Sequence, residues 1–266
     1  MALNFLNQFL KWGYGPHNGP HTWSNWYPIA EEGVRQSPVD VPEKEVEQDS
    51  SLLPISCNYG DGEYCKMNNT GASWMLNLWP EENWLRGGPL QGEYRGFQVH
   101  AHWGSSPGQG SEHTISGQSF DAEIHIVHYN TKYENSGESL DKHDGLAVLG
   151  MLVKTGKPHP HFDIIARHLC EIHESGSEIM LEESFNPELL LPEGDRSYYT
   201  YPGSLTTPPL FESVTWILFC SPIELSEDQI NKMRSLTTGC ESSKCMVDNY
   251  RPPLDKKGRK IKKFCQ

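Results

Sequence analysis

The sequence predicts one sheet-dominated domain, mostly β with a smaller helical part (α+β). Two observations support this fold class: many short runs of β-branched and aromatic residues lie between turn residues, and few segments have helical periodicity. The chain of 266 residues also contains no segment with the composition of a linker. We therefore expect a single domain over residues 1–266, which can bury roughly three quarters of its unfolded surface without disulfides.

The N-terminal third is expected to hold turns and short strands. Residues 12–28 are rich in aromatic residues, Gly and Pro, a composition that indicates irregular structure with packed rings rather than a helix. Residues 36–41 are predicted to form a turn into a short edge segment. The alternation of strand-forming and turn residues then predicts short strands at 52–59, 63–69, 73–79 and 94–102, with a Gly-Gly-Pro turn at 87–89.

The C-terminal half combines buried strands with two helices. Residues 146–154 and 213–220 are continuous apolar runs of strand length, which is typical of buried strands. Residues 162–173 are predicted to form an amphipathic helix, because apolar residues recur there at helical spacing. Ser226 and Gln229 have the spacing of a capping box, so a second helix is expected to begin there. The residues expected on the inner faces of these helices are Phe162, Ile165, Leu169, Ile172, Ile230 and Met233.

The chain is acidic, with a net charge of −13 at pH 7 from 22 Lys and Arg against 35 Asp and Glu. Nucleic acid and anionic membranes attract clustered basic residues, so neither is the expected partner. The one short basic run, at 256–263, is expected to be a solvated terminal segment. The composition therefore favours a protein that acts on small molecules.

The seven cysteines indicate free thiols rather than a disulfide framework, since their number is odd and the chain is long. Cys57 and Cys65 could flank a hairpin and form a bridge, but two free thiols in a reducing compartment are the favoured interpretation. Residues 1–11 lack the basic region and the cleavage site of a signal peptide, and no apolar run approaches the ~20 residues of a membrane span. These features predict a cytoplasmic protein.

The densest group of potential metal ligands lies on two predicted strands. Val, Ile and Tyr residues surround the histidines at 100, 102, 125 and 128, which is typical of strands. Alternate residues of a strand point to the same face. The first strand therefore places Gln98, His100 and His102 on one face, and the second places Glu123, His125 and Val127 on one face, with Ile124, Ile126 and His128 opposite.

If the two strands pair, His100, His102 and His125 can converge on one point. Three imidazoles and a water molecule are the ligands of a catalytic zinc, at about 2.0–2.1 Å from each nitrogen. The sequence therefore predicts a zinc site formed by these three residues, and it places His128 in the core.

A series of motifs along the chain resembles the alpha-class carbonic anhydrases. These are WGYG at 12–15, HNGP at 17–20, QSPVD at 36–40, GGPL at 87–90, HAHWG at 100–104, GSEHT at 110–114, AEIHIVHYNTKY at 122–133, DGLAVLG at 144–150, YPGSLTTPPL at 201–210, VTWI at 214–217 and VDNYRPP at 247–253. Any one motif could arise by chance. The ordered set covers nearly the whole chain, which chance does not explain.

The resemblance implies a central, twisted, mainly antiparallel sheet of about ten strands with short peripheral helices. It also implies a C-terminal strand that threads through a loop as a shallow knot. The implied activity is the reversible hydration of carbon dioxide to bicarbonate and a proton, by attack of a zinc-bound hydroxide at the bottom of a conical cleft. Carbon dioxide and bicarbonate would be the small-molecule partners and sulfonamide-type compounds the inhibitors, and we expect a monomer.

The resemblance also implies roles for individual residues. His100, His102 and His125 would be the zinc ligands, with Gln98 and Glu123 orienting the imidazoles. Thr206 would give its one proton to the carboxylate of Glu112 and could then only accept a hydrogen bond from the hydroxide. The residues implied to form the substrate pocket are Val127, Val148, Leu205, Thr207, Val214 and Trp216, most of which would otherwise be read as core residues.

The chain departs from the family pattern at residue 72. Fast family members carry a histidine there, in an N-x-G-H motif, which passes the proton from the cleft to buffer. This chain reads Asn69-Thr70-Gly71-Ala72, and an alanine side chain cannot carry a proton. We therefore expect a working zinc site with slow proton export. His17, near the cleft rim in family members, is the best substitute, although a rim histidine is more often only solvated.

Two alternatives remain open. Secreted family members usually pair a cysteine before QSPVD with one after TTPP, and the absence of cysteine from both regions favours the cytoplasm over secretion. The chain could also be a non-catalytic carbonic-anhydrase-related binding protein or a mineral-matrix protein. The three histidines with Glu112 and Thr206 favour the enzyme, and the acidic residues are spread along the chain rather than clustered, which disfavours a matrix role.

Overall fold

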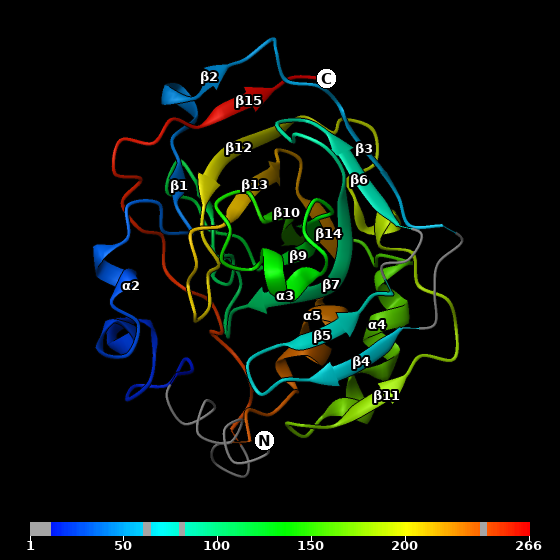
Figure 1. Cartoon of the computed structure of the whole chain (residues 1–266). Coiled ribbons are helices and arrows are strands. Elements are labelled where there is room, and N and C mark those ends of the chain that lie inside the picture. Colours follow the sequence, from blue (N-terminus) through cyan, green and yellow to red (C-terminus); the bar gives the residue numbers. More distant parts are fainter. Residues whose placement is uncertain (1–11, 61–64, 80–82, 240–243) are drawn as a thin grey trace.

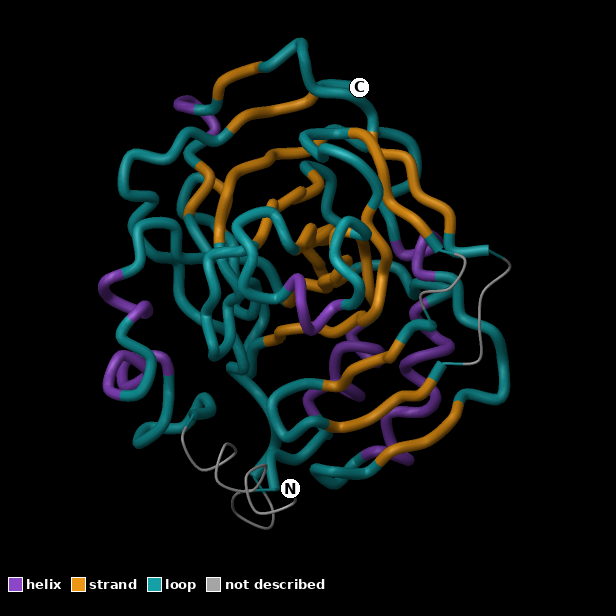
Figure 2. The backbone as a smooth tube through the Cα atoms, viewed as in Figure 1, coloured by secondary structure: helices purple, strands orange, loops and turns teal. Residues whose placement is uncertain are grey.

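The computed structural model of the chain describes residues 12–60, 65–79, 83–239 and 244–266. Figure 1 shows a strongly twisted central sheet with short helices around it, and Figure 2 shows how much of the molecule is strand and loop. Within the described residues, 13 strands form one mixed sheet, and two further strands form a separate small sheet. The predicted fold class, mostly β with short peripheral helices, is confirmed.

The longest strands form the centre of the sheet. These are β7 (Tyr94–Trp103), β9 (Ala122–Asn130) and β10 (Leu146–Thr155), and every residue of β9 is buried. The shorter strands are β1 (Asp40–Val41), β2 (Glu47–Gln48), β3 (Ile55–Asn58), β4 (Lys66–Asn69), β5 (Trp74–Asn77), β6 (Trp84–Gly87), β8 (Thr114–Ile115), β11 (Glu178–Met180), β12 (Tyr198–Gly203), β13 (Val214–Phe219), β14 (Ile223–Leu225) and β15 (Lys262–Phe264).

The order of the strands agrees with a mainly antiparallel sheet. Neighbours follow the path β11-β4-β5-β7-β9-β10-β13-β12-β15-β2, while β3, β6 and β14 pair beside it. β10 runs parallel to β13 and β14, and β15 runs parallel to β2. The other pairs of this sheet are antiparallel. The expectation of about ten strands therefore matches the continuous path, beside which the short side strands come in addition.

The helices are short and lie around the sheet. The helix predicted over 162–173 is confirmed as α4 (Phe162–His168) followed by the 3₁₀ helix η3 (Leu169–Ile172), with the predicted apolar stripe buried. The capping box of Ser226 and Gln229 is formed at the start of α5 (Glu227–Arg234), which contacts α4 and β7. The other helices are η1 (Pro20–Asn25), α2 (Ile29–Glu32), η2 (Glu43–Glu45), α3 (Ser136–Ser139) and η4 (Pro187–Leu190).

The prediction of irregular structure over 12–28 is wrong for residues 20–25, which form η1. Pro20 stands at the start of this helix, where its fixed φ suits the helix and its missing N–H is not needed. A 3₁₀ helix of six residues is too short to show an apolar periodicity that a sequence pattern could reveal. The predicted packing of rings is confirmed, because Trp23 is fully buried with Trp12 and Tyr14 edge-on to it.

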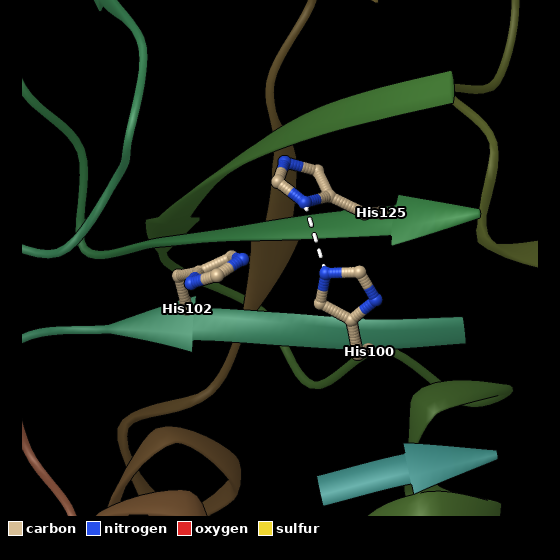
Figure 3. A group of neighbouring side chains, drawn as sticks. All are labelled: His100, His102 and His125. Atoms are coloured by element: carbon tan, nitrogen blue, oxygen red, sulfur yellow. Dashed lines mark hydrogen bonds between the residues drawn. The ribbon is translucent and has the colours of Figure 1, made fainter. Parts of the chain in front are cut away.

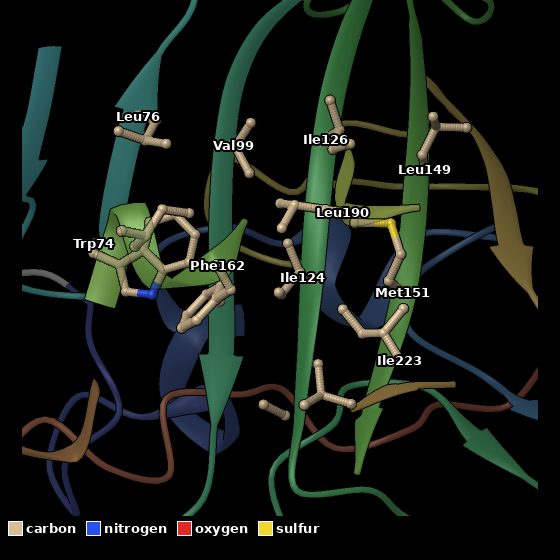
Figure 4. Close-up of a cluster of buried hydrophobic side chains, with 14 of the residues drawn as sticks. Trp74, Leu76, Val99, Ile124, Ile126, Leu149, Met151, Phe162, Leu190 and Ile223 are labelled. Atoms are coloured by element: carbon tan, nitrogen blue, oxygen red, sulfur yellow. The ribbon is translucent and has the colours of Figure 1, made fainter. Parts of the chain in front are cut away.

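The central strands present different side chains on their two faces. On one face Val99, Ile124, Ile126 and Leu149 pack into the main hydrophobic core, together with Phe162 from α4 (Figure 4). The other face carries the predicted metal ligands and a smaller apolar cluster. This alternation follows from the two-residue period of a strand, and it separates the core from the candidate site.

The C-terminal strand β15 lies inside the sheet, between β12 and β2. Lys260 pairs with Glu47 at 2.8 Å, and Lys262 pairs with Asp49 at 2.7 Å. The expectation of a solvated terminal segment at 256–263 is therefore wrong for its end, because Lys262 and Lys263 belong to a strand of the sheet. An interior C-terminal strand is what a threaded C-terminus requires, and the knot itself stays a prediction.

Further predictions concern disulfide bonds, membrane spans and domain organisation. Cys57 carries a free thiol, so a bridge to Cys65 is not formed. In the part of the chain that the structure describes, no helix is long and apolar enough to cross a lipid bilayer. Three predictions concern residues that the structure does not describe. They are the lack of a signal peptide in residues 1–11, the start of the strand at 63–69, and the free thiol of Cys240. A single domain over 1–266 also stays a prediction.

His128 lies in the core, as strand alternation predicts. Its side chain is fully buried, with Nε2 2.6 Å from the hydroxyl of Tyr59 and Nδ1 3.3 Å from the carbonyl oxygen of Ala147. Burial lowers the pKa of His128 to about 4, although the carbonyl of Ala147 opposes the shift. The imidazole is therefore neutral in the folded protein over most of the pH range.

We expect His128 to make the protein less stable in mild acid. The unfolded chain protonates this residue near pH 6.5, whereas the folded chain does so only near pH 4, so the free energy of unfolding falls by about 3 kcal/mol across that window and levels off below it. Urea unfolding of the wild type and of His128→Gln from pH 7 to 4 measures this contribution. The stability difference between the two proteins must shrink as the pH falls, and a constant difference would contradict the assignment.

Candidate metal centre

Three imidazoles meet over the neighbouring strands β7 and β9. His100 is the register partner of His125, and His102 lies two residues further along β7, on the same face. The ring centroids are 5.2 Å apart for His100 and His102, 5.1 Å for His100 and His125, and 4.9 Å for His102 and His125. One nitrogen of each ring lies within 4.8 Å of the others, and Figure 3 shows the rings gathered between the two strands. The structure thus brings the three predicted ligands together.

Two of these rings, those of His102 and His125, are fixed by hydrogen bonds on the side away from the centre. His102 Nδ1 donates to the backbone carbonyl of Asn249 at 2.7 Å, and His125 Nε2 donates to Glu123 Oε1 at 2.8 Å. His102 Nε2 and His125 Nδ1 are then left for the centre. His102 Nε2 is buried and has no hydrogen-bond partner among the described residues. A buried polar atom without a partner costs folding free energy unless another group, such as a metal ion, binds it. Three imidazoles with such an unpartnered nitrogen fit a zinc ion.

Burial favours the neutral form of two imidazoles of the centre, His100 and His102. It lowers the pKa of His100 well below the ordinary value, and the neighbouring His125 and His102 lower it further. Burial also lowers the pKa of His102, against the opposing charge of Glu112. Because a metal ion binds the neutral imidazole, this environment prepares the ligands for binding.

Glu123 gathers the hydrogen bonds behind His125. It is fully buried; Oε1 accepts from His125 and from His113 Nδ1, the latter at 2.7 Å. Oε2 accepts from the backbone N–H of Glu112 at 2.9 Å and of His113 at 2.8 Å. Burial alone would raise the pKa of Glu123, but the charge and hydrogen bonds of His113, with those of His125, lower it well below the usual range. A carboxylate held by four donors fixes the ring of His125 in turn.

Glu112 lies fully buried beside His102. Its Oε1 accepts from the backbone N–H of Arg251 at 2.9 Å, and its Oε2 lies 3.3 Å from His102 Nε2. No hydrogen-bond partner of Oε2 is found among the described residues. The predicted hydrogen bond from Thr206 is therefore not formed in this structure, and the role of Thr206 stays a prediction.

Thr206 stands on a loop that is tied to the sheet at several points. Trp216 Nε1 donates to the carbonyl oxygen of Ser204 at 3.1 Å, and the backbone N–H of Ser204 donates to Ser37 Oγ at 3.0 Å. The N–H of Leu205 donates to the carbonyl oxygen of Phe211 at 3.0 Å. Because these bonds hold the loop on both sides, the buried side chain of Thr206 has a fixed position.

An apolar cluster lies beside His125 on the same face. Val127, Val148 and Trp216 are register neighbours on β9, β10 and β13, and all three are buried. The ring of Trp216 lies 4.9 Å from that of His125. Of the residues expected to form the pocket, this cluster contains Val127, Val148, Val214 and Trp216, with Leu205 packed against it, while Thr207 is half-buried on the loop.

Gln98 lies on the face of the ligands without the predicted hydrogen bond, and Ala72 lies beside Asn249. Gln98 lies on the face of His100, but His100 Nδ1 has no hydrogen-bond partner in the described part of the chain, so the predicted orienting bond is not formed. His100 Nε2 instead lies 3.2 Å from His125 Nδ1, the dashed contact in Figure 3. The orienting role of Gln98 stays a prediction. Ala72 is half-buried, and its carbonyl oxygen accepts from Asn249 Nδ2 at 2.8 Å.

Known proteins resemble the chain over almost its full length. A family model described as eukaryotic-type carbonic anhydrase matches residues 18–265. Carbonic anhydrase 3 of Mus musculus is 41% identical over 256 residues, which cover 95% of this chain and 97% of the mouse protein. Carbonic anhydrase 1 of Monodelphis domestica is 40% identical over 258 residues, with the same two shares. The chain belongs to the carbonic anhydrase family.

As a carbonic anhydrase, the chain is a carbonate dehydratase, an enzyme for carbon dioxide and bicarbonate. The family depends on zinc and is inhibited by sulfonamides. In this carbonic anhydrase the group His100, His102 and His125 could hold the metal. A second close group, His113, Glu123 and His125, uses its donor atoms for the hydrogen bonds behind His125, so it supports the first group rather than forming another site.

The sequence did not identify three residues that shape this carbonic anhydrase centre. Asn249 holds His102, Arg251 holds Glu112, and His113 binds Glu123. Asn249 and Arg251 act through backbone atoms more than a hundred residues away in sequence, and a backbone atom leaves no signal in residue type. His113 lies in the quoted GSEHT motif, where its spacing to Glu123 could have suggested a contact.

Proposed function

We propose that this carbonic anhydrase hydrates carbon dioxide reversibly to bicarbonate and a proton, with one zinc ion held by His100, His102 and His125. The observation that carries the proposal is the meeting of three imidazoles, with the buried His102 Nε2 left unpartnered among the described residues. A zinc ion there supplies a Lewis acid that lowers the pKa of its water to about 7, the value known for carbonic anhydrases, against about 15.7 for bulk water. Stopped-flow hydration by chelator-stripped and zinc-restored protein tests the proposal.

Glu112 and Thr206 are proposed to orient the oxygen that attacks carbon dioxide. An ionised carboxylate only accepts hydrogen bonds, and Glu112 Oε2 is available to accept the proton of the Thr206 hydroxyl. The hydroxyl of Thr206 can then only accept, so it turns the attacking oxygen with a lone pair toward the substrate carbon. Thr207, next along the loop, is proposed to contact bicarbonate.

The apolar cluster beside His125 is proposed to hold the substrate. Carbon dioxide is apolar, so a dry wall favours its approach to the centre. Val127 shares the face of His125 and is buried, with Val148 and Trp216 next to it in register. The small side chains of Val127 and Val148 leave room for the substrate, whereas larger ones would fill it.

We expect Val127→Phe to lower kcat/KM for carbon dioxide by about 100-fold, because the ring would occupy the substrate's place and displace it from the attacking oxygen. Zinc affinity should stay within about threefold of the wild-type value, since Val127 donates no ligand. Stopped-flow hydration and a chelator competition measure the two quantities. Val127→Ala, which keeps the space open, is the matched control and should retain most of the activity. Unchanged kcat/KM in Val127→Phe would show that the substrate binds elsewhere.

Proton export is proposed to be the slow part of the reaction. Each hydration releases a proton that must leave the cleft, and Ala72 stands where fast relatives carry a proton-transferring histidine. The exposed His17 is the proposed substitute. Export should therefore depend on small buffer molecules that enter the cleft.

The remaining proposals concern the cellular location, the oligomeric state and a possible non-catalytic role. We propose a cytoplasmic monomer, on the sequence features given above, with secretion as the alternative. A non-catalytic or mineral-matrix role finds no specific support, because the histidine ligands, Glu112 and Thr206 are all present.

A further inference from the structure

One short segment, residues 246–251, touches the metal centre with backbone atoms at two places. The carbonyl oxygen of Asn249 accepts from the ligand His102 at 2.7 Å, and the N–H of Arg251 donates to Glu112 at 2.9 Å. The carbonyl oxygen of Met246 also accepts from Trp103 Nε1 at 2.7 Å. The path of this segment therefore sets both the ring of His102 and the carboxylate of Glu112.

Backbone atoms orient a ligand only if the backbone conformation is fixed. Within the segment, Asp248 has a φ of +56°, in the left-handed region that few L-residues adopt. Asparagine and aspartate tolerate this region better than other non-glycine residues. Asp248 immediately precedes Asn249, so its conformation decides where the carbonyl oxygen of Asn249 and the N–H of Arg251 point.

The side chain of Asp248 adds a second anchor. Its Oδ1 accepts from the backbone N–H of Ser105 at 2.8 Å, just beyond the end of β7, the strand that carries His102. Asn249 ties the same region, because its Oδ1 accepts from the N–H of Trp103 at 2.8 Å. Consecutive residues thus fasten the segment to the chain immediately after His102.

We propose that Asp248 is a positioning residue of the metal centre. Its left-handed backbone and its bond to Ser105 hold the 246–251 segment so that Asn249 orients His102 and Arg251 orients Glu112. Asp248 is exposed and is neither a ligand nor a member of the pocket. This inference rests on the proposed zinc site. It states that a residue outside the site fixes the orientation of His102 and Glu112.

The test is a series of three substitutions with zinc affinity as the readout. Asp248→Ala disfavours the left-handed backbone and removes the acceptor, so we expect zinc binding about 10- to 100-fold weaker, as for other residues that orient a ligand. Asp248→Gly keeps the backbone conformation and should lose less. Asp248→Asn keeps both features and should bind zinc like the wild type. Competition with a chelator gives the dissociation constants, and the absorption spectrum of the cobalt-substituted proteins reports ligand geometry.

Ser116→Ala is the matched control. Ser116 is also an exposed non-glycine residue with a left-handed φ, +49°, and its Oγ also accepts from a backbone N–H, that of Glu43 at 3.2 Å. Within the described residues it makes no hydrogen bond to the proposed ligands or to Glu112. Its replacement should cost similar stability in urea unfolding of the metal-free protein and leave zinc affinity unchanged.

The outcomes separate this inference from the proposed function. Wild-type protein that binds no zinc would overturn both. Zinc-binding wild type with equal affinity in Asp248→Ala would overturn only the positioning role, as would an equal loss in Ser116→Ala or a failure of Asp248→Asn to restore affinity. If Asp248→Ala does not fold, Asp248→Gly decides: weaker binding than in Asp248→Asn supports the role, and equal binding overturns it.

Discussion

His102→Ala is expected to weaken zinc binding by more than about 100-fold and to abolish carbon dioxide hydration above background. The substitution removes one of three ligands, and the loss must exceed the 10- to 100-fold cost of removing a residue that merely orients a ligand. It also leaves Glu112 Oε2 without the imidazole that lies 3.3 Å away. Zinc content after dialysis and stopped-flow hydration measure the two effects.

His173→Ala is the control for this substitution, because His173 is exposed and its side chain pairs with Glu174 rather than with a residue of the centre. It should change neither zinc content nor activity. Urea unfolding of both metal-free variants shows whether His102→Ala still folds. Full activity in a metal-free His102→Ala protein would overturn the proposed mechanism.

Ala72→His is expected to raise kcat in dilute buffer by about 10- to 100-fold, because a histidine near neutral pKa can carry the released proton. The backbone at this position is well placed for the gain. The carbonyl oxygen of Ala72 accepts from Asn249, and Asn249 also holds His102, so a side chain at 72 has a fixed relation to the centre. Stopped-flow hydration over a range of buffer concentrations measures the effect, and kcat/KM should stay unchanged.

Ala72→Gln is the matched control, since glutamine fills similar space and has no titrating group. It should leave kcat as low as in the wild type. Imidazole added to the wild type should raise kcat toward the value of Ala72→His. If the wild type already turns over fast in dilute buffer and imidazole does not accelerate it, the loss of the shuttle has no consequence.

The candidate ligands could be predicted from the sequence because strand alternation is a local rule. Alternation placed His100 and His102 on one face of a strand and His125 on one face of the next, and it moved His128 into the core. All four placements agree with the structure. The motif resemblance then supplied the strand pairing that alternation alone leaves open.

The residues that orient the ligands were harder to predict. Gln98 has the right face and spacing, yet His100 Nδ1 lacks a partner among the described residues, because sharing a face does not fix a side-chain rotamer. Asn249 holds His102 through a carbonyl oxygen that every residue possesses, so its identity carried no signal. Such contacts depend on how the chain returns from a distant position, which a local pattern does not encode.

The short elements were missed for a related reason. Strands of two or three residues, such as β2, β8 and β15, are too short to show alternation. β15 is fixed by its neighbours β12 and β2, and its lysines resemble a solvated tail in sequence. Long, apolar segments such as β10 were predicted almost to their ends because burial on both faces demands a continuous apolar run.

The most direct test of the zinc-dependent hydration proposed here is a stopped-flow measurement on the wild-type chain, stripped of metal and then titrated with zinc at several imidazole concentrations. We predict no activity without zinc and full activity at one zinc per chain. We also predict a kcat that rises with imidazole while kcat/KM stays constant, since buffer replaces the missing proton carrier at Ala72. Hydration at the same rate by the stripped protein, or no activity at one zinc per chain, would contradict the account.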